Sequence, residues 1–182
     1  MDKWKTLSKR TILSSELFEV TQTKFKLPNG KLKTREDVIR KPTVCVFPID
    51  GDSFYLISEY RELWNERMLH AVAGLVDKEG ETTLQTAKRE LLEEAGMEAY
   101  HWEEIIRYRL AASVIKGTTS LFLAKDLEFL SQKLEDDEKI KVVKLSFKDA
   151  VGKVFSGEIS DSATIIGILM IVSYDFRIKH IV

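Results

Sequence analysis

The sequence contains little cysteine, little proline and almost no net charge. Its single cysteine, Cys45, excludes an internal disulfide and a zinc site built from several cysteines. Because Cys45 lies in the apolar run 43–47, we interpret it as a small buried residue rather than a nucleophile. A lone cysteine also favours a cytoplasmic setting. The three prolines stand at positions 28, 42 and 48.

Long apolar runs are also missing. The most apolar segment, residues 165–172, is much shorter than the roughly 20 residues that span a bilayer. Residues 1–5 lead into polar sequence, so we expect no secretory signal. The formal net charge of −1 argues against a general binder of nucleic acids or anionic membranes, which would normally be basic.

What the chain does have is the composition of a globular protein, with 182 residues of which 44% are hydrophobic and 31% charged. Residues 17–40 show two strand patterns around the turn Pro28-Asn29-Gly30, so we expect a β-hairpin in region 1–40. Residues 41–182 mix strands with helices, which predicts an α+β domain with a mixed sheet between helices. Its strands are expected at 43–49, 54–57, 105–111, 120–124 and 140–145. Its helices are expected between a cap at Thr82 or Thr83 and Gly96, after Ser146, and from 160 or 161 to about 178.

The most informative segment is an acidic helix that ends at Gly96. Thr82 or Thr83 can cap its start, and Gly96 supplies the left-handed residue that ends it. Its apolar residues line one face at helical spacing, and three glutamates occupy an adjoining arc. The apolar residues are Leu84, Ala87, Leu91 and Ala95, and the glutamates are Glu90, Glu93 and Glu94.

Three neighbouring carboxylates repel one another, and a bound cation would relieve that repulsion. Hard oxygen ligands suit Mg²⁺ or Mn²⁺. Taken alone, however, glutamates on a helix more often form a solvated face, so a further pattern is needed to favour a metal site.

That pattern is present, because the segment from Gly74 to Met97 resembles the Nudix box, G-x5-E-x7-R-E-U-x-E-E-x-G-U with U a bulky apolar residue. Every specified position from Glu81 to Met97 matches. One departure is that six residues, rather than five, separate Gly74 from Glu81. We expect the additional residue in a turn at 77–79, since loops accept insertions at low cost.

The resemblance extends, more loosely, over residues 17–172. Four further segments resemble the branch of Nudix hydrolases that contains ADP-ribose and nucleoside diphosphate sugar pyrophosphatases. They are Glu59-Tyr60-Arg61, the residues 72–74 that lead into the box, the acidic loop 135–138, and residues 157–161 near the end of the similar region. This similarity implies a Nudix-type αβα sandwich with a mixed sheet. It also implies a homodimer in which the N-terminal hairpin takes part.

The resemblance further implies a metal site on the acidic helix. Glu90 and Glu94 would be the main ligands, Glu93 a further ligand or the residue that holds the attacking water, and the Ala73 carbonyl a backbone ligand. An ion pair between Glu81 and Arg89 would orient the helix; the alternative is a weak surface salt bridge.

The catalytic base would come from the acidic loop 135–138. The family pattern makes Asp136 the candidate base and Glu138 a metal-side ligand, although a solvated acidic turn explains these residues equally well. Arg61 is expected to contact the substrate diphosphate, because a guanidinium matches phosphate oxygens. Gly74 and Ser113 are further expected substrate contacts.

The predicted function is Mg²⁺-dependent hydrolysis of a nucleoside diphosphate sugar, ADP-ribose or a nucleoside diphosphate hexose, to a nucleoside monophosphate and a sugar phosphate. Ala111 and Ala112 stand where ADP-ribose hydrolases of the family usually carry a proline, which favours a hexose substrate. Two alternatives remain open. One is a catalytically silent nucleotide-sugar-binding module, and the other is a Nudix hydrolase of nucleoside triphosphates or dinucleoside polyphosphates.

Overall fold

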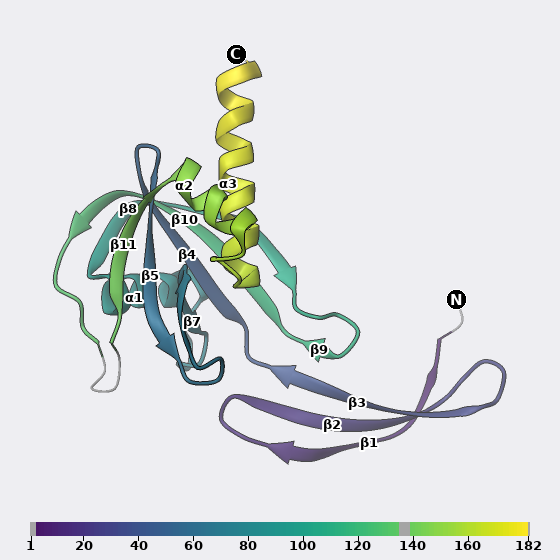
Figure 1. Cartoon of the computed structure of the whole chain (residues 1–182). Helices are drawn as coiled ribbons and strands as arrows, with labels where there is room; N and C mark the ends of the chain where they lie inside the picture. Colours follow the sequence, from purple (N-terminus) through teal and green to yellow (C-terminus); the bar gives the residue numbers. More distant parts are fainter. Residues whose placement is uncertain (1–2, 135–138, 182) are drawn as a thin grey trace. The chain divides into compact units, whose positions relative to one another are not determined.

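The computed structural model describes residues 3–134 and 139–181, with side chains as far as residue 173. The chain forms two compact units (Figure 1). Unit 1 comprises Met1–Pro42 and Tyr108–Thr119, and unit 2 comprises Thr43–Arg107 and Ser120–Val182. The division into domains at residue 40 stays a prediction; in the structure, residues 108–119 are grouped with the N-terminal part.

Unit 1 is built on a sheet with the strand order β1-β2-β3-β9. β2 and β3 form the predicted hairpin, in which Phe18 pairs with Arg40 and Lys26 with Leu32. Gly30 closes its turn with a positive φ of 80°, and its amide donates to the Leu27 carbonyl at 2.9 Å. The strands are β1 (Lys5–Ser14), β2 (Phe18–Lys26), β3 (Leu32–Arg40) and β9 (Ile115–Lys116).

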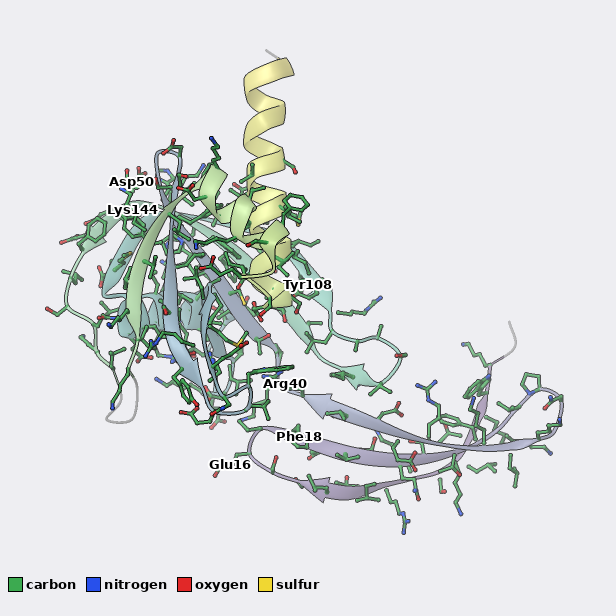
Figure 2. The ribbon with its side chains drawn as sticks, viewed as in Figure 1. Glu16, Phe18, Arg40, Asp50, Tyr108 and Lys144 are labelled. Atoms are coloured by element: carbon green, nitrogen blue, oxygen red, sulfur yellow. The ribbon has the colours of Figure 1, made fainter. Side chains whose placement is uncertain are left out.

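β1 is a strand that the sequence pattern did not predict. It pairs antiparallel with β2, and Glu16 and Phe18 mark the turn between them (Figure 2). Its register shifts twice, between Thr6 and Ser8 and again between Thr11 and Leu13. Such bulges interrupt the alternation of polar and apolar residues that identifies a strand in a sequence. The N-terminal hairpin is therefore extended to three antiparallel strands.

Unit 2 contains a sheet with the strand order β11-β5-β4-β10-β8, in which β6 also pairs with β5 and β7 with β4. At the β4–β5 turn, the Asp50 carboxylate accepts from the Lys144 ammonium of β11 at 2.9 Å (Figure 2). The strands are β4 (Thr43–Asp50), β5 (Ser53–Arg61), β6 (Glu66–His70), β7 (Val72–Leu75), β8 (Met97–Arg109), β10 (Thr118–Phe129) and β11 (Lys141–Ser146). The helices are α1 (Thr83–Ala95), α2 (Phe147–Ser156) and α3 (Ser162–Ile181).

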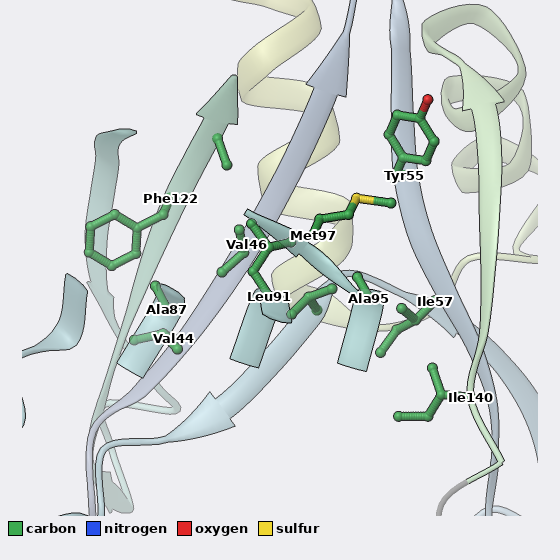
Figure 3. Packing of buried hydrophobic residues seen from close by; sticks show 12 residues of the cluster. Val44, Val46, Tyr55, Ile57, Ala87, Leu91, Ala95, Met97, Phe122 and Ile140 are labelled. Carbon is green, nitrogen blue, oxygen red and sulfur yellow. The ribbon is translucent and has the colours of Figure 1, made fainter. Parts of the chain in front are cut away.

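The core of unit 2 lies on both faces of β4. Val44 and Val46 are fully buried and cluster with Ala87 and Leu91 of α1 (Figure 3). Phe47 points to the opposite face, where a Cβ added at Gly167 of α3 would lie 2.0 Å from its ring. A strand buried on both faces between helices is the arrangement expected for an αβα sandwich.

The predicted helix starts after β11 and before α3 are also found. The Ser146 hydroxyl caps α2 by accepting from the Asp149 amide, and the Asp161 carboxylate accepts from the Thr164 amide at 2.8 Å. None of the described helices combines the length and the apolar character that a bilayer crossing needs.

Candidate active site

Helix α1 positions the expected metal-binding glutamates, and the sequence explains both of its ends. Thr82 is the N-cap, and it forms a reciprocal capping box with Gln85: each side chain accepts from the backbone amide of the other residue. At the other end Gly96 is left-handed, with φ 61° and ψ 41°, and its amide donates to the Leu91 and Leu92 carbonyls. Of the two predicted caps the structure has Thr82, and the predicted end at Gly96 is confirmed.

The buried face of α1 is wider than its apolar residues suggest. Ala87, Leu91 and Ala95 are buried as expected, but Thr86 and Glu94 are buried with them, at 0% and 7% exposure. A buried carboxylate requires partners, because transfer of a charge out of water is costly. The surroundings of Glu94 therefore determine what this helix can do.

Arg89 binds three carboxylates, those of Glu81, Glu90 and Glu93. Its Nε donates to Glu81 Oε1 at 3.1 Å, so the predicted Glu81–Arg89 ion pair is present. Its Nη1 lies 2.7 Å from Glu90 Oε1 and 2.8 Å from Glu93 Oε2, which places these two carboxylates on one side of the helix. The hydrogen bond from Arg89 lowers the pKa of Glu81, even though burial acts in the opposite direction.

Glu90 packs directly against the backbone of β7. A Cβ added at Gly74 would lie 2.0 Å from Glu90 Oε1, so only glycine leaves room for this carboxylate. Burial raises the pKa of Glu90 to about 7, and the nearby Arg89 offsets only part of that effect. The pKa of Glu90 thus lies near neutral pH, and its carboxyl group lies against the backbone of Gly74 in β7.

Glu94 links α1 to the same segment, because its Oε2 accepts from the Ala73 amide at 3.1 Å. Ala73 pairs with Cys45 in the β4–β7 ladder, so the Glu94 carboxylate binds β7 at the residue opposite Cys45. Burial, with the charges of Asp161 and Glu94, raises the pKa of the Cys45 thiol well above its usual range. This supports the interpretation of Cys45 as an inert buried residue.

The donors around Ala73 and Gly74 fit a divalent cation in chemical kind. Carboxylate and carbonyl oxygens are the ligands that hard cations prefer, and Glu90, Glu93 and Glu94 all lie on α1 beside or near β7. Within the described residues no three acidic, histidine or cysteine side chains are already gathered as ligands, since Arg89 engages two of these carboxylates and the Ala73 amide the third. We conclude that the donor set and the glycine cradle suit a metal ion.

Arg61 belongs to a second polar cluster at the end of β5. Its Nη2 contacts Glu59 Oε1, and the same oxygen lies 3.0 Å from Nε2 of the buried His70. Burial alone would raise the pKa of Glu59. The hydrogen bond with His70 and the charge of Arg61 together outweigh burial, so the pKa is lowered. No role was predicted for His70 from the sequence. Its position directly before residues 71–74 was the one feature of the sequence that could have indicated a role near the site.

Three predicted site residues remain: Ser113, Asp136 and Glu138. Ser113 is an exposed residue of unit 1, and its carbonyl accepts from the Arg35 guanidinium of the same unit. Asp136 and Glu138 lie outside the described residues. The structure therefore brings together Ala73, Gly74, Glu90, Glu93 and Glu94 within unit 2.

The chain is similar to known proteins, both in its domain sequence and over most of its length. The NUDIX domain profile matches residues 39–156, which include the whole of α1 and β7. The chain belongs to the Nudix family. Over 163 residues it is 30% identical to an ADP-ribose pyrophosphatase of Bacillus subtilis, covering 88% of each chain. It is also 26% identical to an ADP-ribose pyrophosphatase of Mycobacterium tuberculosis, covering 92% of this chain and 83% of the relative.

The Nudix fold is confirmed as well. A crystal structure of an ADP compounds hydrolase superposes with a TM-score of 0.85 at 23% identity, covering 96% of this chain and 95% of the other. The relatives confirm the resemblance to the ADP-ribose pyrophosphatase branch. Nudix hydrolases use divalent metal ions, which agrees with the donor chemistry around Ala73 and Gly74.

Proposed function

We propose that this Nudix protein hydrolyses the diphosphate of a nucleoside diphosphate sugar, with Mg²⁺ or Mn²⁺ as its metal ion. ADP-ribose is the first candidate because two similar proteins are ADP-ribose pyrophosphatases. A nucleoside diphosphate hexose is the second. The observation that carries the proposal is the group of glutamates on α1 beside the close backbone of Ala73 and Gly74. The products are a nucleoside monophosphate and a sugar phosphate.

Three carboxylates and one carbonyl are our candidate metal ligands: Glu90, Glu93, Glu94 and the carbonyl of Ala73. These groups would hold a divalent ion, which would supply neutralisation of charge on the phosphoryl oxygens and a more acidic water. Glu90 must give up its proton to act as a ligand, and because burial raises its pKa to about 7 without metal, protons compete with the metal ion at this residue. Glu93 has the more exposed side chain of the Arg89-bound pair, at 35% against 12% for Glu90, which suits it to holding a water.

The base that accepts the proton of the attacking water is proposed to be Asp136, with Glu138 as a metal-side ligand. Glu93 and Glu94 complete our set of catalytic residues. Substitution of Asp136 and Glu138 one at a time, with kcat measured against pH, would distinguish a base from a ligand. A lost base removes the acidic limb of the profile, whereas a lost ligand raises the metal concentration needed.

Arg61, Gly74 and Ser113 are the proposed substrate contacts. The Arg61 side chain is 46% exposed although Glu59 binds it, and a guanidinium has five N–H donors, so donors remain for phosphate oxygens. Gly74 offers backbone without a side chain beside the glutamates. Ser113 offers an exposed hydroxyl on the loop before β9.

We further propose a cytoplasmic homodimer. Unit 1 exposes large apolar side chains on β1 and at the start of β2, among them Leu7, Ile12, Leu13 and Phe18 at 38% to 50% exposure. A second copy of the chain is the partner that would cover them. Light scattering after size-exclusion chromatography would test this proposal, and a monomer at micromolar concentration would contradict it.

A substrate panel tests the proposed activity. ADP-ribose, ADP-glucose, UDP-glucose and GDP-mannose are incubated with Mg²⁺ or Mn²⁺, and release of the nucleoside monophosphate is measured with an EDTA control. ATP and a dinucleoside polyphosphate extend the panel to the alternative substrates. We expect cleavage of at least one nucleotide sugar and none with EDTA. Tight binding without turnover would instead support a silent binding module, and preference for ATP would support a triphosphate hydrolase.

A further inference from the structure

Ala71 is the residue at which the chain changes its partner strand. The β5–β6 ladder ends with the pair Ile57 and His70, and the β4–β7 ladder begins with Val46 and Val72. Ala71 lies between these ladders and is 1% exposed. Its backbone amide and carbonyl therefore need partners from outside the sheet, because buried peptide groups are almost always paired.

Both groups of Ala71 are bound by side chains. Its amide donates to Thr164 Oγ1 at 2.9 Å, and its carbonyl accepts from His70 Nδ1 at 2.9 Å. Thr164 is fully buried in the first turn of α3, at 0% exposure. A helix that follows the catalytic segment by about 90 residues thus supplies the partner that the sheet lacks.

Asp161 determines how the Thr164 hydroxyl is used. The hydroxyl donates to Asp161 Oδ2 at 2.7 Å, and the same oxygen accepts from the Thr164 amide at 2.8 Å. A hydroxyl has one proton, so a hydroxyl that donates to a carboxylate can only accept from Ala71. Asp161 therefore caps the helix and orients the hydroxyl at once.

α3 is itself held firmly against the sheet. Gly167, one turn after Thr164, packs so closely on Phe47 of β4 that a Cβ there would lie 2.0 Å from the ring. Ile168 is fully buried beside it. The position of the Thr164 hydroxyl is thus set by packing as well as by its cap.

The bound peptide lies two residues before the proposed metal ligand. From Ala71 the chain runs through the buried Val72 to Ala73, whose amide donates to Glu94, and to Gly74, which abuts Glu90. A shift at Ala71 would be transmitted to Ala73, since only one buried residue separates them. Both Asp161 and Thr164 lie beyond the 39–156 match to the NUDIX domain.

We propose that Thr164, oriented by Asp161, is a positioning residue that fixes the Ala71–Ala73 backbone for metal binding. This inference rests on the proposed function, because it concerns the metal site of that activity. It adds Thr164 of α3, and Asp161 just before that helix, to the proposed metal ligands on α1 and β7.

Four variants test the proposal. Thr164→Val keeps the size of the side chain and removes the hydroxyl, whereas Thr164→Ser keeps the hydroxyl and should restore normal behaviour. Asp161→Asn keeps an oxygen for the helix cap but weakens the acceptor for the hydroxyl, so it serves if Thr164→Val does not fold. Ile168→Val loosens the same helix without touching the hydrogen bonds and controls for a general packing defect.

The readouts are Mn²⁺ affinity by electron paramagnetic resonance and hydrogen exchange of the Ala71 amide in the metal-free protein. We expect Thr164→Val to weaken Mn²⁺ binding about tenfold, as loss of an outer contact to a metal site does, and to speed Ala71 exchange. Asp161→Asn should weaken binding about threefold, a fraction of that tenfold loss. Thr164→Ser and Ile168→Val should bind Mn²⁺ as the parent protein does.

Two results would overturn the inference. If Thr164→Val and Asp161→Asn bind Mn²⁺ normally while the parent cleaves a nucleotide sugar, positioning fails and the proposed function stands. If the parent binds no Mn²⁺, both fail together. Weakened Mn²⁺ binding in a protein that cleaves no nucleotide sugar would support the positioning role and refute the proposed substrate.

Discussion

The two units of the molecule differ most in charge. Unit 1 contains thirteen lysines and arginines against five aspartates and glutamates, and unit 2 contains fifteen against twenty-four. Their formal charges are thus +8 and −9, which together give the net charge of −1. A whole-chain net charge therefore describes neither unit. Unit 2 needs cations to receive an anionic diphosphate, which is the role that a metal ion and Arg61 would fill.

The units differ equally in burial. All ten residues of β1 are exposed, whereas β4 is buried continuously from Val44 to Pro48. Substitutions of Glu90 or Glu94 in unit 2 should consequently change chemistry and folding, because these carboxyl groups are largely desolvated and closely packed. Substitutions in unit 1 should act on contacts with substrate or with a second copy. Four predictions test this contrast.

The largest effect is expected for Glu94→Gln in unit 2. The glutamine keeps the shape of the buried side chain but removes the charge of a proposed metal ligand. We expect kcat to fall roughly a thousandfold, since several kcal/mol of charge stabilisation are lost. The far-ultraviolet circular dichroism and the melting temperature should stay close to those of the parent protein. Glu19→Gln, an exposed change on β2 of unit 1, is the matched control, and near-normal turnover of Glu94→Gln would remove its metal role.

A pH-dependent effect follows from Glu90. Burial raises its pKa from the ordinary 4.5 to about 7, so the folded chain holds a proton that the unfolded chain releases. Without metal, this contribution to the free energy of unfolding is present below pH 4.5 and is lost as the pH rises to about 7. The loss is on the order of 3 kcal/mol by linkage.

Urea unfolding in EDTA between pH 4.5 and 8 measures this loss, and Glu90→Gln should abolish it. Mg²⁺ should restore stability chiefly above pH 7, where the carboxylate is ionised. The Glu81 carboxyl has a lowered pKa, so its own contribution changes at lower pH, below its ordinary value of 4.5. A parent profile that stays flat from pH 4.5 to 8 would contradict the prediction.

A smaller effect is expected for Gly74→Ala. The added methyl group would lie 2.0 Å from Glu90 Oε1, so the carboxylate must move away from β7. We expect the Mn²⁺ affinity to fall about 10- to 100-fold, the usual range for a disturbed metal environment. Gly152→Ala in α2 is the matched control, because nothing lies within 4 Å of its added Cβ. Calorimetric titration with Mn²⁺ compares the two variants, and equal affinities would show that Glu90 has room to move.

The sequence predicted α1 and its caps, because these features depend on residues close together in the chain, and the resemblance to the Nudix box predicted the Glu81–Arg89 pair. It did not predict β1, whose two register shifts remove the alternation of polar and apolar residues. It also missed the Thr164–Ala71 and Glu94–Ala73 hydrogen bonds. Such contacts join residues far apart in sequence, so no local pattern encodes them. The predicted helix is thus confirmed, the role of its glutamates as metal ligands stays a prediction, and the contacts that hold the opposing strand were not predicted.

The smallest effect is expected in unit 1, for Ser113→Ala. The Ser113 carbonyl accepts from Arg35, and the substitution leaves that contact in place because it removes only the hydroxyl. If the hydroxyl binds substrate, KM should rise about threefold to tenfold, the equivalent of one hydrogen bond, with kcat unchanged. Steady-state kinetics on the best substrate of the panel measure both parameters. An unchanged KM would show that Ser113 does not bind substrate, which would leave Arg61 and Gly74 of unit 2 as the proposed contacts. A fall in kcat would instead show that unit 1 takes part in the chemical step.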